Sequence, residues 1–153
     1  MYSHLEDFIY KLYTSIGVKD PTGLEMHKIA KKLGVEITYD ENKIFRFENE
    51  ISLKKCTKRQ EWMDFAHELG HCLMHCGLQV SMHPLFVELQ EWQANNFAYH
   101  FCVPTFMLDK LYNYTVYDVM QLFNVEYDFA CKRLEMYKNK KQGEIIHGQA
   151  AIT

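Results

Sequence analysis

Three residues in the segment EWMDFAHELGHCLMHCG, residues 61–77, form the pattern H-E-x-x-H: His67, Glu68 and His71. On a helix, residues four apart lie on one face about 5–6 Å from each other. Two imidazoles at that spacing can converge on one zinc ion at about 2.0–2.1 Å each. Glu68 points about 100° further around the helix. It is therefore placed to take a proton from water, as a general base, and not to join the ligands.

A catalytic zinc ion needs a third protein ligand, because such sites combine three side chains with one open position. We predict that Glu91 supplies it, from the next helix along the chain. Asn95 follows Glu91 by one turn and could accept a hydrogen bond from a ligating histidine. Glu88, one turn earlier, is the alternative ligand.

Two helices must bring these groups together. Thr57 and Gln60 match a capping box, so a helix should run over residues 58–76. Pro84 suits the first turn of a second helix over residues 84–102. Glycine inside a helix costs about 0.8–1.0 kcal/mol relative to alanine. Gly70 is therefore expected to allow a neighbouring element to approach closely.

Other residues in the segment that could bind metal fit the site less well. His75 lies about 12 Å along the helix axis from His67, too far to share one ion with it. Cys72 and Cys76 point about 100° away from the histidine row. We expect both cysteines to be small buried hydrophobes, and the same for Cys102 and Cys131.

The rest of the chain predicts an α+β fold that is mostly helical, with a small and mostly antiparallel sheet of about three strands. The expected segments are N-terminal helices within 1–34, a sheet at 35–55 with strands near 35–39, 43–47 and 50–54, a C-terminal helical pair at 115–123 and 126–139, and a flexible tail at 140–153. Residues 1–139 are expected to form a single domain. The strand at 50–54 could hold an extended substrate by main-chain hydrogen bonds.

The chain resembles the ImmA/IrrE family of zinc metallopeptidases. The resemblance rests on HELGHCLMH at 67–75, EWQANNFAYHFCVP at 91–104 and LEMHKIAKKLGVEITY at 24–39. It covers roughly residues 24–137, and one departure is Gln93, where the family commonly has a second glutamate.

The resemblance implies a zincin-like fold, with one Zn²⁺ ion held by His67, His71 and Glu91 and with Glu68 as general base. It also implies cleavage of a helix-turn-helix repressor that belongs to the same phage or mobile element.

Composition limits the other possibilities. A net charge of −3 gives no strong field toward nucleic acid or anionic membrane. The N-terminus does not have the pattern of a secretory signal, and no apolar stretch is long enough to span a bilayer. With an odd count of five cysteines, these features indicate free thiols in a reducing cytoplasm, and the resemblance to a family of phages and mobile elements implies that this is the cytoplasm of a bacterial host cell. We expect a protein substrate, no membrane partner and no direct contact with nucleic acid.

Two other classes of function stay open at this point. The chain could act as an antirepressor that binds its partner through a metal-dependent module without cutting it. It could also be a DNA-associated regulator that uses residues 115–137, where Lys132 and Arg133 lie on the second helix. Nearby acidic residues make DNA binding by this segment less favoured than a structural role, in which residues 115–137 pack against the peptidase domain.

The basic cluster at 54–59 is a solvated face or a contact for an acidic stretch of substrate. Tyr99 and His100 follow the third ligand, but neither can be assigned to stabilising an oxyanion.

Overall fold

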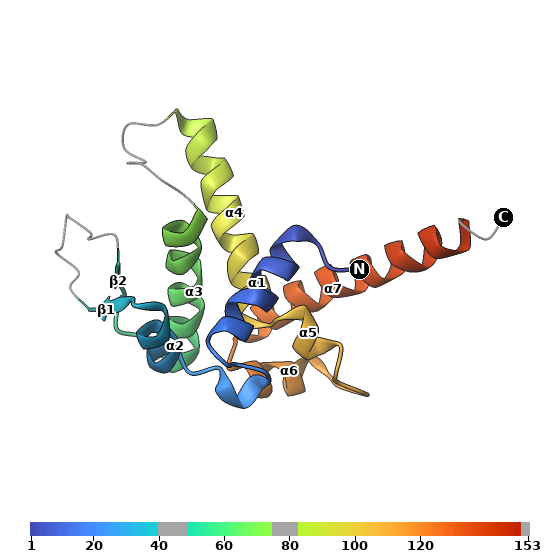
Figure 1. Cartoon of the computed structure of the whole chain (residues 1–153), viewed down its shortest axis with the longest axis horizontal. Coiled ribbons are helices and arrows are strands. Elements are labelled where there is room, and N and C mark those ends of the chain that lie inside the picture. The colour runs from blue at the N-terminus through green and yellow to red at the C-terminus, as the bar shows by residue number, and fades with distance from the viewer. Residues whose placement is uncertain (40–48, 75–82, 151–153) are drawn as a thin grey trace.

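The computed structural model describes residues 1–39, 49–74 and 83–150, with side chains up to residue 146. Within these residues the elements follow in the order α1 (His4–Ser15), η1 (Pro21–Gly23), α2 (Met26–Leu33), β1 (Glu36–Thr38), β2 (Glu50–Ser52), α3 (Lys58–Met74), α4 (Pro84–Cys102), α5 (Thr105–Leu108), α6 (Val116–Phe123) and α7 (Tyr127–Ala150). Helices α3 and α4 lie side by side, with the sheet and α2 on one side of α3 (Figure 1). The predicted α+β class with mostly helical content is confirmed.

The sheet differs from the prediction. Strands β1 and β2 pair directly and in parallel, with Ile37 opposite Ile51. The sequence analysis expected a mostly antiparallel sheet of about three strands, whereas the described residues contain two strands that pair in parallel. Alternating side chains identify a strand without identifying its neighbour or the relative direction of the two, so the sequence did not predict this parallel pairing. The expected strand at 43–47 lies outside the described residues.

The core is formed where α1, α3 and α4 meet. Phe97 and Phe101 stack with ring centroids 5.3 Å apart, and Tyr13 stacks on Phe101 at 4.9 Å. The Tyr13 hydroxyl donates a hydrogen bond of 2.7 Å to the carbonyl of Phe101. Phe65 and Leu69 on α3 are fully buried against this cluster. The apolar face of α3 is therefore used for packing, which leaves its histidine face toward solvent.

The C-terminal helices are a packing extension of this core. Val119 and Phe123 on α6 and Ala130 on α7 are fully buried. Thr115 and Asp118 form a capping box at the start of α6, and Asn124 ends it in the left-handed conformation with φ 54°. These residues fit the predicted helical pair, because short polar caps define both ends of the first helix.

Arg133 on α7 is buried and anchors that helix. Its Nε donates to the carbonyl of Val103 at 3.0 Å, and its guanidinium donates to Oγ1 of Thr105 at 2.7 Å. The Thr105 hydroxyl in turn donates to Glu6 on α1, whose other oxygen pairs with Lys140 at 2.7 Å. Arg133 therefore ties the first and last helices together and is not a surface group for DNA.

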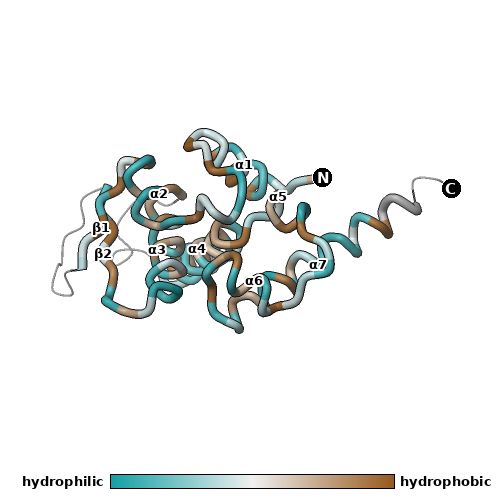
Figure 2. The backbone as a smooth tube through the Cα atoms, turned by 90° about the horizontal axis from the view of Figure 1, so that it is seen from below, coloured by the Kyte–Doolittle hydropathy of each residue, from teal (hydrophilic) through white to brown (hydrophobic). Residues whose placement is uncertain are grey.

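Helix α7 continues to Ala150, so the expectation of a helix that ends at 139 and is followed by a tail from 140 is wrong. Lys140 and Glu144 explain part of the difference, because they pair with groups near the start of the chain. The outer half of α7 extends away from the other helices, whereas the hydrophobic stretches of α3, α4 and α6 lie toward the middle (Figure 2). No helix in the described part of the chain is long and apolar enough to cross a membrane.

Candidate metal centre

The side chains of His67, His71 and Glu91 converge on one point between α3 and α4. Nε2 of His67 lies 3.1 Å from Nε2 of His71. The two Glu91 carboxylate oxygens lie 3.2 Å from these nitrogens, one from each. The side chains are 24 %, 17 % and 42 % exposed, in the same residue order, so the cluster is reached from solvent. The structure thus brings together the three residues that the sequence analysis proposed as ligands.

The spacing of these atoms fits a tetrahedral metal ion. Ligand atoms about 2.0–2.1 Å from a tetrahedral zinc ion must lie about 3.3 Å from one another. The observed separations of 3.1 and 3.2 Å are close to that value. Two imidazole nitrogens and one carboxylate also form a ligand set that zinc takes in hydrolytic enzymes. The described residues contain a group that could hold a metal ion, and Glu68 is not one of its three members.

The local sequence explains why α3 begins where it does. The Thr57 hydroxyl accepts a hydrogen bond from the backbone N–H of Gln60 at 3.2 Å, as the predicted cap requires. The Gln60 side chain does not return to complete the box, since it donates to Asp64 instead. Glu61 accepts from the backbone N–H of Cys56 at 3.0 Å and so fixes the turn before the helix.

Gly70 allows α4 to approach α3 closely beside His67 and His71. A Cβ atom built on Gly70 would lie 3.3 Å from the Cα of Ala94 and 3.0 Å from Cδ1 of Phe97. Ala94 and Phe97 are on the helix that carries Glu91. The prediction that Gly70 permits close approach of the second helix is confirmed.

Asn95 supports His67 from the side opposite the cluster. Its Oδ1 lies 2.9 Å from Nδ1 of His67. A carbonyl oxygen can only accept, so Nδ1 carries the proton, and Nε2 of the neutral imidazole keeps its lone pair for a metal ion at the point where His67, His71 and Glu91 converge. Such an outer partner fixes both the tautomer and the ring orientation of a ligating histidine. The predicted role of Asn95 as acceptor is confirmed.

Several other candidates lie away from the cluster. Glu88 is exposed and is not a member of it. Cys72 is exposed, so the expectation that it is buried is wrong; it lies in the last turn of α3, where Leu73 and Met74 are exposed as well. Cys102 is fully buried, as expected, and Cys131 is half-buried. His75 and Cys76 lie outside the described residues.

A pocket of about 340 Å³ adjoins the cluster of His67, His71 and Glu91, and the sequence analysis missed this pocket. Met63, Ala98 and Phe129 give it apolar surface, while His67 and Tyr99 also line it. The spacing of Gln60, Asp64 and His67 on one helical face was the signal that could have indicated a groove here.

Tyr99 and His100 line two different pockets. The ring of Tyr99 packs on Phe129 at 4.5 Å within the pocket beside His67. His100 lines a different pocket with Arg133, and its Nδ1 bonds the carbonyl of Asn96. Burial, followed by the charge of Arg133, lowers the pKa of His100 to about 4. Of the two residues, only Tyr99 shares a pocket with a cluster histidine.

Comparison with known proteins places the chain in a family of peptidases. Residues 25–135 match the peptidase family described as the IrrE N-terminal-like domain, so the chain belongs to that family. It is 38 % identical over 151 residues to the phage-like element PBSX protein XkdA of Bacillus subtilis, covering 92 % of this chain and 76 % of that protein. It is 32 % identical over 148 residues to the uncharacterized protein YqaB of the same organism, covering 90 % of this chain and 86 % of YqaB. No solved structure matches the chain significantly. The resemblance to the ImmA/IrrE family is confirmed.

Proposed function

We propose that this protein is a zinc-dependent endopeptidase. The observation that carries the proposal is the convergence of His67, His71 and Glu91, with donor atoms all within 4.8 Å of one another, on a helix pair where Glu68 follows His67 directly. Membership in a peptidase family supports the same class of reaction.

The proposed roles follow from the chemistry of each group. His67, His71 and Glu91 would hold the ion, and the hydrogen bond to Asn95 favours the tautomer of His67 that can bind it. Bound zinc would act as a Lewis acid toward the scissile carbonyl and the attacking water. Glu68 accepts a proton from that water and donates it to the leaving amine, which is the work of a general base and then a general acid. The carboxylate suits this task because it is half-buried on the same helix as both histidines.

We propose a helix-turn-helix repressor of a phage or mobile element as the substrate, cleaved in the bacterial cytoplasm. One support is the relative XkdA, whose name places it in a phage-like element. The second support is that the pocket beside His67 can receive a substrate side chain, with Met63 and Phe129 as its apolar surface. Main-chain contacts of the substrate are expected at the strand that contains Glu50–Ser52.

The test is incubation of the purified, zinc-loaded protein with the repressor encoded beside it, followed by mass spectrometry of the products. Glu68→Gln should keep zinc and lose cleavage by roughly a hundredfold or more, since general-base catalysis contributes about 10²–10⁴-fold. Glu88→Gln is the matched control, because it removes an exposed glutamate outside the cluster and should cleave normally.

The same two variants distinguish hydrolysis from the alternative function, an antirepressor that binds its partner without cutting it. If Glu68→Gln still relieves repression as well as the unaltered protein, binding alone explains the effect and the peptidase proposal is wrong. The hypothesis of a DNA-associated regulator has less support. Arg133, on the second of the two C-terminal helices, is 1 % exposed and donates a hydrogen bond to the carbonyl of Val103.

A further inference from the structure

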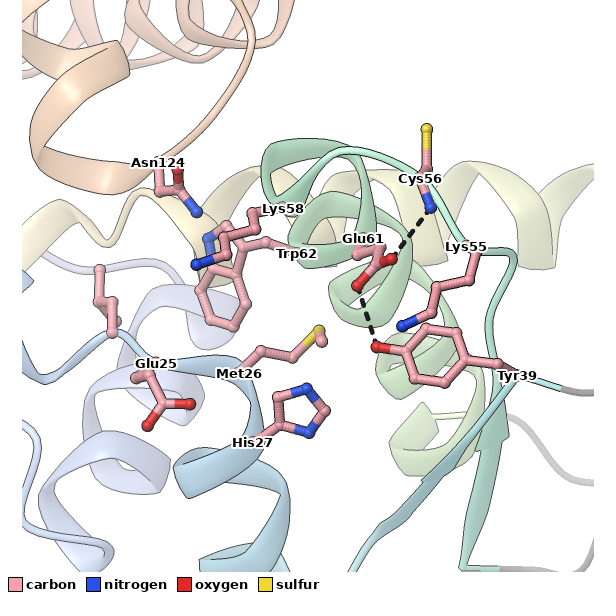
Figure 3. Close-up of a pocket in the computed structure, with 11 residues that line it drawn as sticks. Glu25, Met26, His27, Tyr39, Lys55, Cys56, Lys58, Glu61, Trp62 and Asn124 are labelled. Atoms are coloured by element: carbon pink, nitrogen blue, oxygen red, sulfur yellow. Dashed lines mark hydrogen bonds between the residues drawn. The ribbon is translucent and has the colours of Figure 1, made fainter.

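A second cavity, of about 480 Å³, lies near the N-terminal end of α3 and contains none of the proposed metal ligands. Its walls come from α2, from the turn between β2 and α3, from the first turns of α3 and from the end of α6 (Figure 3). Its volume falls in the range of small-molecule sites, about 300–1,000 Å³. The cavity includes Lys55, Cys56 and Lys58 from the basic segment at 54–59.

Trp62 gives this cavity a polar group that lacks a partner. The residue is 2 % exposed, and its indole nitrogen has no acceptor among the residues that the structure describes. A buried donor left without a partner costs about 1–3 kcal/mol. Native proteins rarely keep such a group, and a functional role is one recognised reason for doing so.

Two further donors line the same cavity as the indole. The ends of the Lys58 and Asn124 side chains lie on the same side of the cavity as the indole nitrogen (Figure 3). Neither side chain makes a hydrogen bond or ion pair with any residue in the described ranges 1–39, 49–74 and 83–150. Lys58 is exposed and long, so its movement can open a path to the covered indole N–H.

The acidic groups that line the cavity are already engaged. Glu61 accepts from the hydroxyl of Tyr39 at 2.9 Å and from the backbone of Cys56, and Glu25 pairs with Lys28 at 3.3 Å. Lys55 lies over the Tyr39 ring, 4.3 Å from its centroid, at the same end as Glu61 (Figure 3). The donor-rich end at Trp62 is therefore the end that suits a negative group.

We propose that this cavity binds a carboxylate ligand, with the carboxylate seated at Trp62, Lys58 and Asn124. A carboxylate offers about four acceptor positions and carries the charge that Lys58 would neutralise. The apolar side chains of Leu24 and Met26 line the cavity and can cover the carbon atoms of the ligand. The carboxylate can belong to a free small acid or to an acidic side chain of a bound protein segment.

The experiment uses the full chain with Trp92→Phe, which removes the other tryptophan, an exposed residue on α4. Trp62 is then followed by its indole N–H proton resonance and by its fluorescence. The probes are glutarate and a glutamate-rich hexapeptide, compared with inorganic phosphate and the matching glutamine-rich hexapeptide. A saturable shift with glutarate identifies a free acid as the ligand, and a shift with the acidic hexapeptide alone identifies a protein segment.

Three variants test the placement. Lys58→Gln and Asn124→Gly should each weaken carboxylate binding by about tenfold or more, as expected for lost charge-assisted or buried hydrogen bonds. Glycine suits position 124 because its φ is 54°. Lys54→Gln is the control, since Lys54 is exposed and does not line the cavity. The proposal is overturned if no probe gives a saturable shift, if phosphate or the glutamine peptide binds equally well, or if Lys54→Gln weakens binding as much as Lys58→Gln.

Discussion

The amide oxygen of Asn95 lies 2.9 Å from Nδ1 of His67, so a residue on α4 sets the protonation of a histidine on α3. Outer partners of this kind typically contribute 10–100-fold to metal affinity. Asn95→Ala should therefore weaken zinc binding by about that factor while the helical circular dichroism stays unchanged. Competition with a fluorescent zinc chelator measures the affinity.

Asn95→Asp provides the matched comparison. It keeps an acceptor oxygen facing Nδ1 and should retain most of the zinc affinity. Equal losses in the Ala and Asp variants would show that Asn95 acts through packing and not through the hydrogen bond.

The choice between the two candidate carboxylates on α4 can be tested directly. Glu91 lies 3.2 Å from both histidine nitrogens, and Glu88 is exposed outside the cluster. Glu91→Ala should lower zinc affinity by roughly a hundredfold or more, because two histidines alone are a poor zinc site. Glu88→Ala should bind zinc normally. Metal content after equilibrium dialysis decides between them, and the reverse ranking would remove Glu91 from the site.

Gly70 and Gly143 offer a matched pair of helical glycines in different surroundings. A Cβ at Gly70 would meet Ala94 and Phe97, whereas a Cβ at Gly143 meets nothing within 4 Å. Alanine gains about 0.8–1.0 kcal/mol of helix propensity at either site. At position 70, overpacking typically costs about 1–3 kcal/mol and should outweigh that gain.

The expected result is that Gly143→Ala raises the free energy of unfolding, while Gly70→Ala lowers it and also weakens zinc binding. Urea denaturation measures the first quantity and chelator competition the second. If Gly70→Ala proved as stabilising as Gly143→Ala, close helix approach would not be the reason for the glycine.

Glu6 predicts how stability changes in acid. Burial opposes its ionisation, but hydrogen bonds from Lys140, Thr105 and the Ser3 N–H outweigh burial and lower its pKa from 4.5 to about 2. A pKa lowered by folding stabilises the protein above the unfolded value, and this contribution is lost as pH falls from about 4.5 toward 2. Its size is on the order of 3 kcal/mol, at about 1.4 kcal/mol per pKa unit.

Glu6→Gln should therefore lower the free energy of unfolding at pH 7 and make it less sensitive to pH between about 4.5 and 2. Urea denaturation at a series of pH values measures both effects. His100 also destabilises the protein in acid, because its pKa of about 4 lies below the ordinary 6.5 and its contribution is lost as pH falls from 6.5 to 4. Both proteins contain His100, and the charge of Glu6 affects the pKa of His100 less than burial and Arg133 do, so most of the difference between the two proteins comes from Glu6 itself. Parallel pH curves for the two proteins would refute the assignment.

The local parts of the fold were predictable from the sequence. Helix α4 has the predicted bounds, because Pro84 can begin a helix and Val103-Pro104 ends it. The i, i+4 histidines face one point for the same local reason, and Glu91 with Asn95 one turn later follows from helical spacing.

The long-range parts were not predictable. The direct pairing of Ile37 with Ile51 depends on the path of the chain between them, which alternating side chains do not specify. In the sequence, Arg133 follows Lys132 and has the pattern of a surface cation. Its burial depends on hydrogen bonds to Thr105 and to the carbonyl of Val103, nearly thirty residues away. The cavity that Trp62 lines could not be predicted from a sequence in which this residue occupies an ordinary apolar position of a helix.

The bonds that Arg133 makes to the segment between α4 and α5 have a consequence for folding. Through Thr105 and Glu6, they link helices that lie at opposite ends of the sequence into one cooperative unit. Backbone amides of α1 and of the inner half of α7 should then exchange with deuterium by the same opening event. The Glu6–Lys140 pair joins residues 134 positions apart, so we expect it to form late in folding, after nearer contacts such as those between α3 and α4.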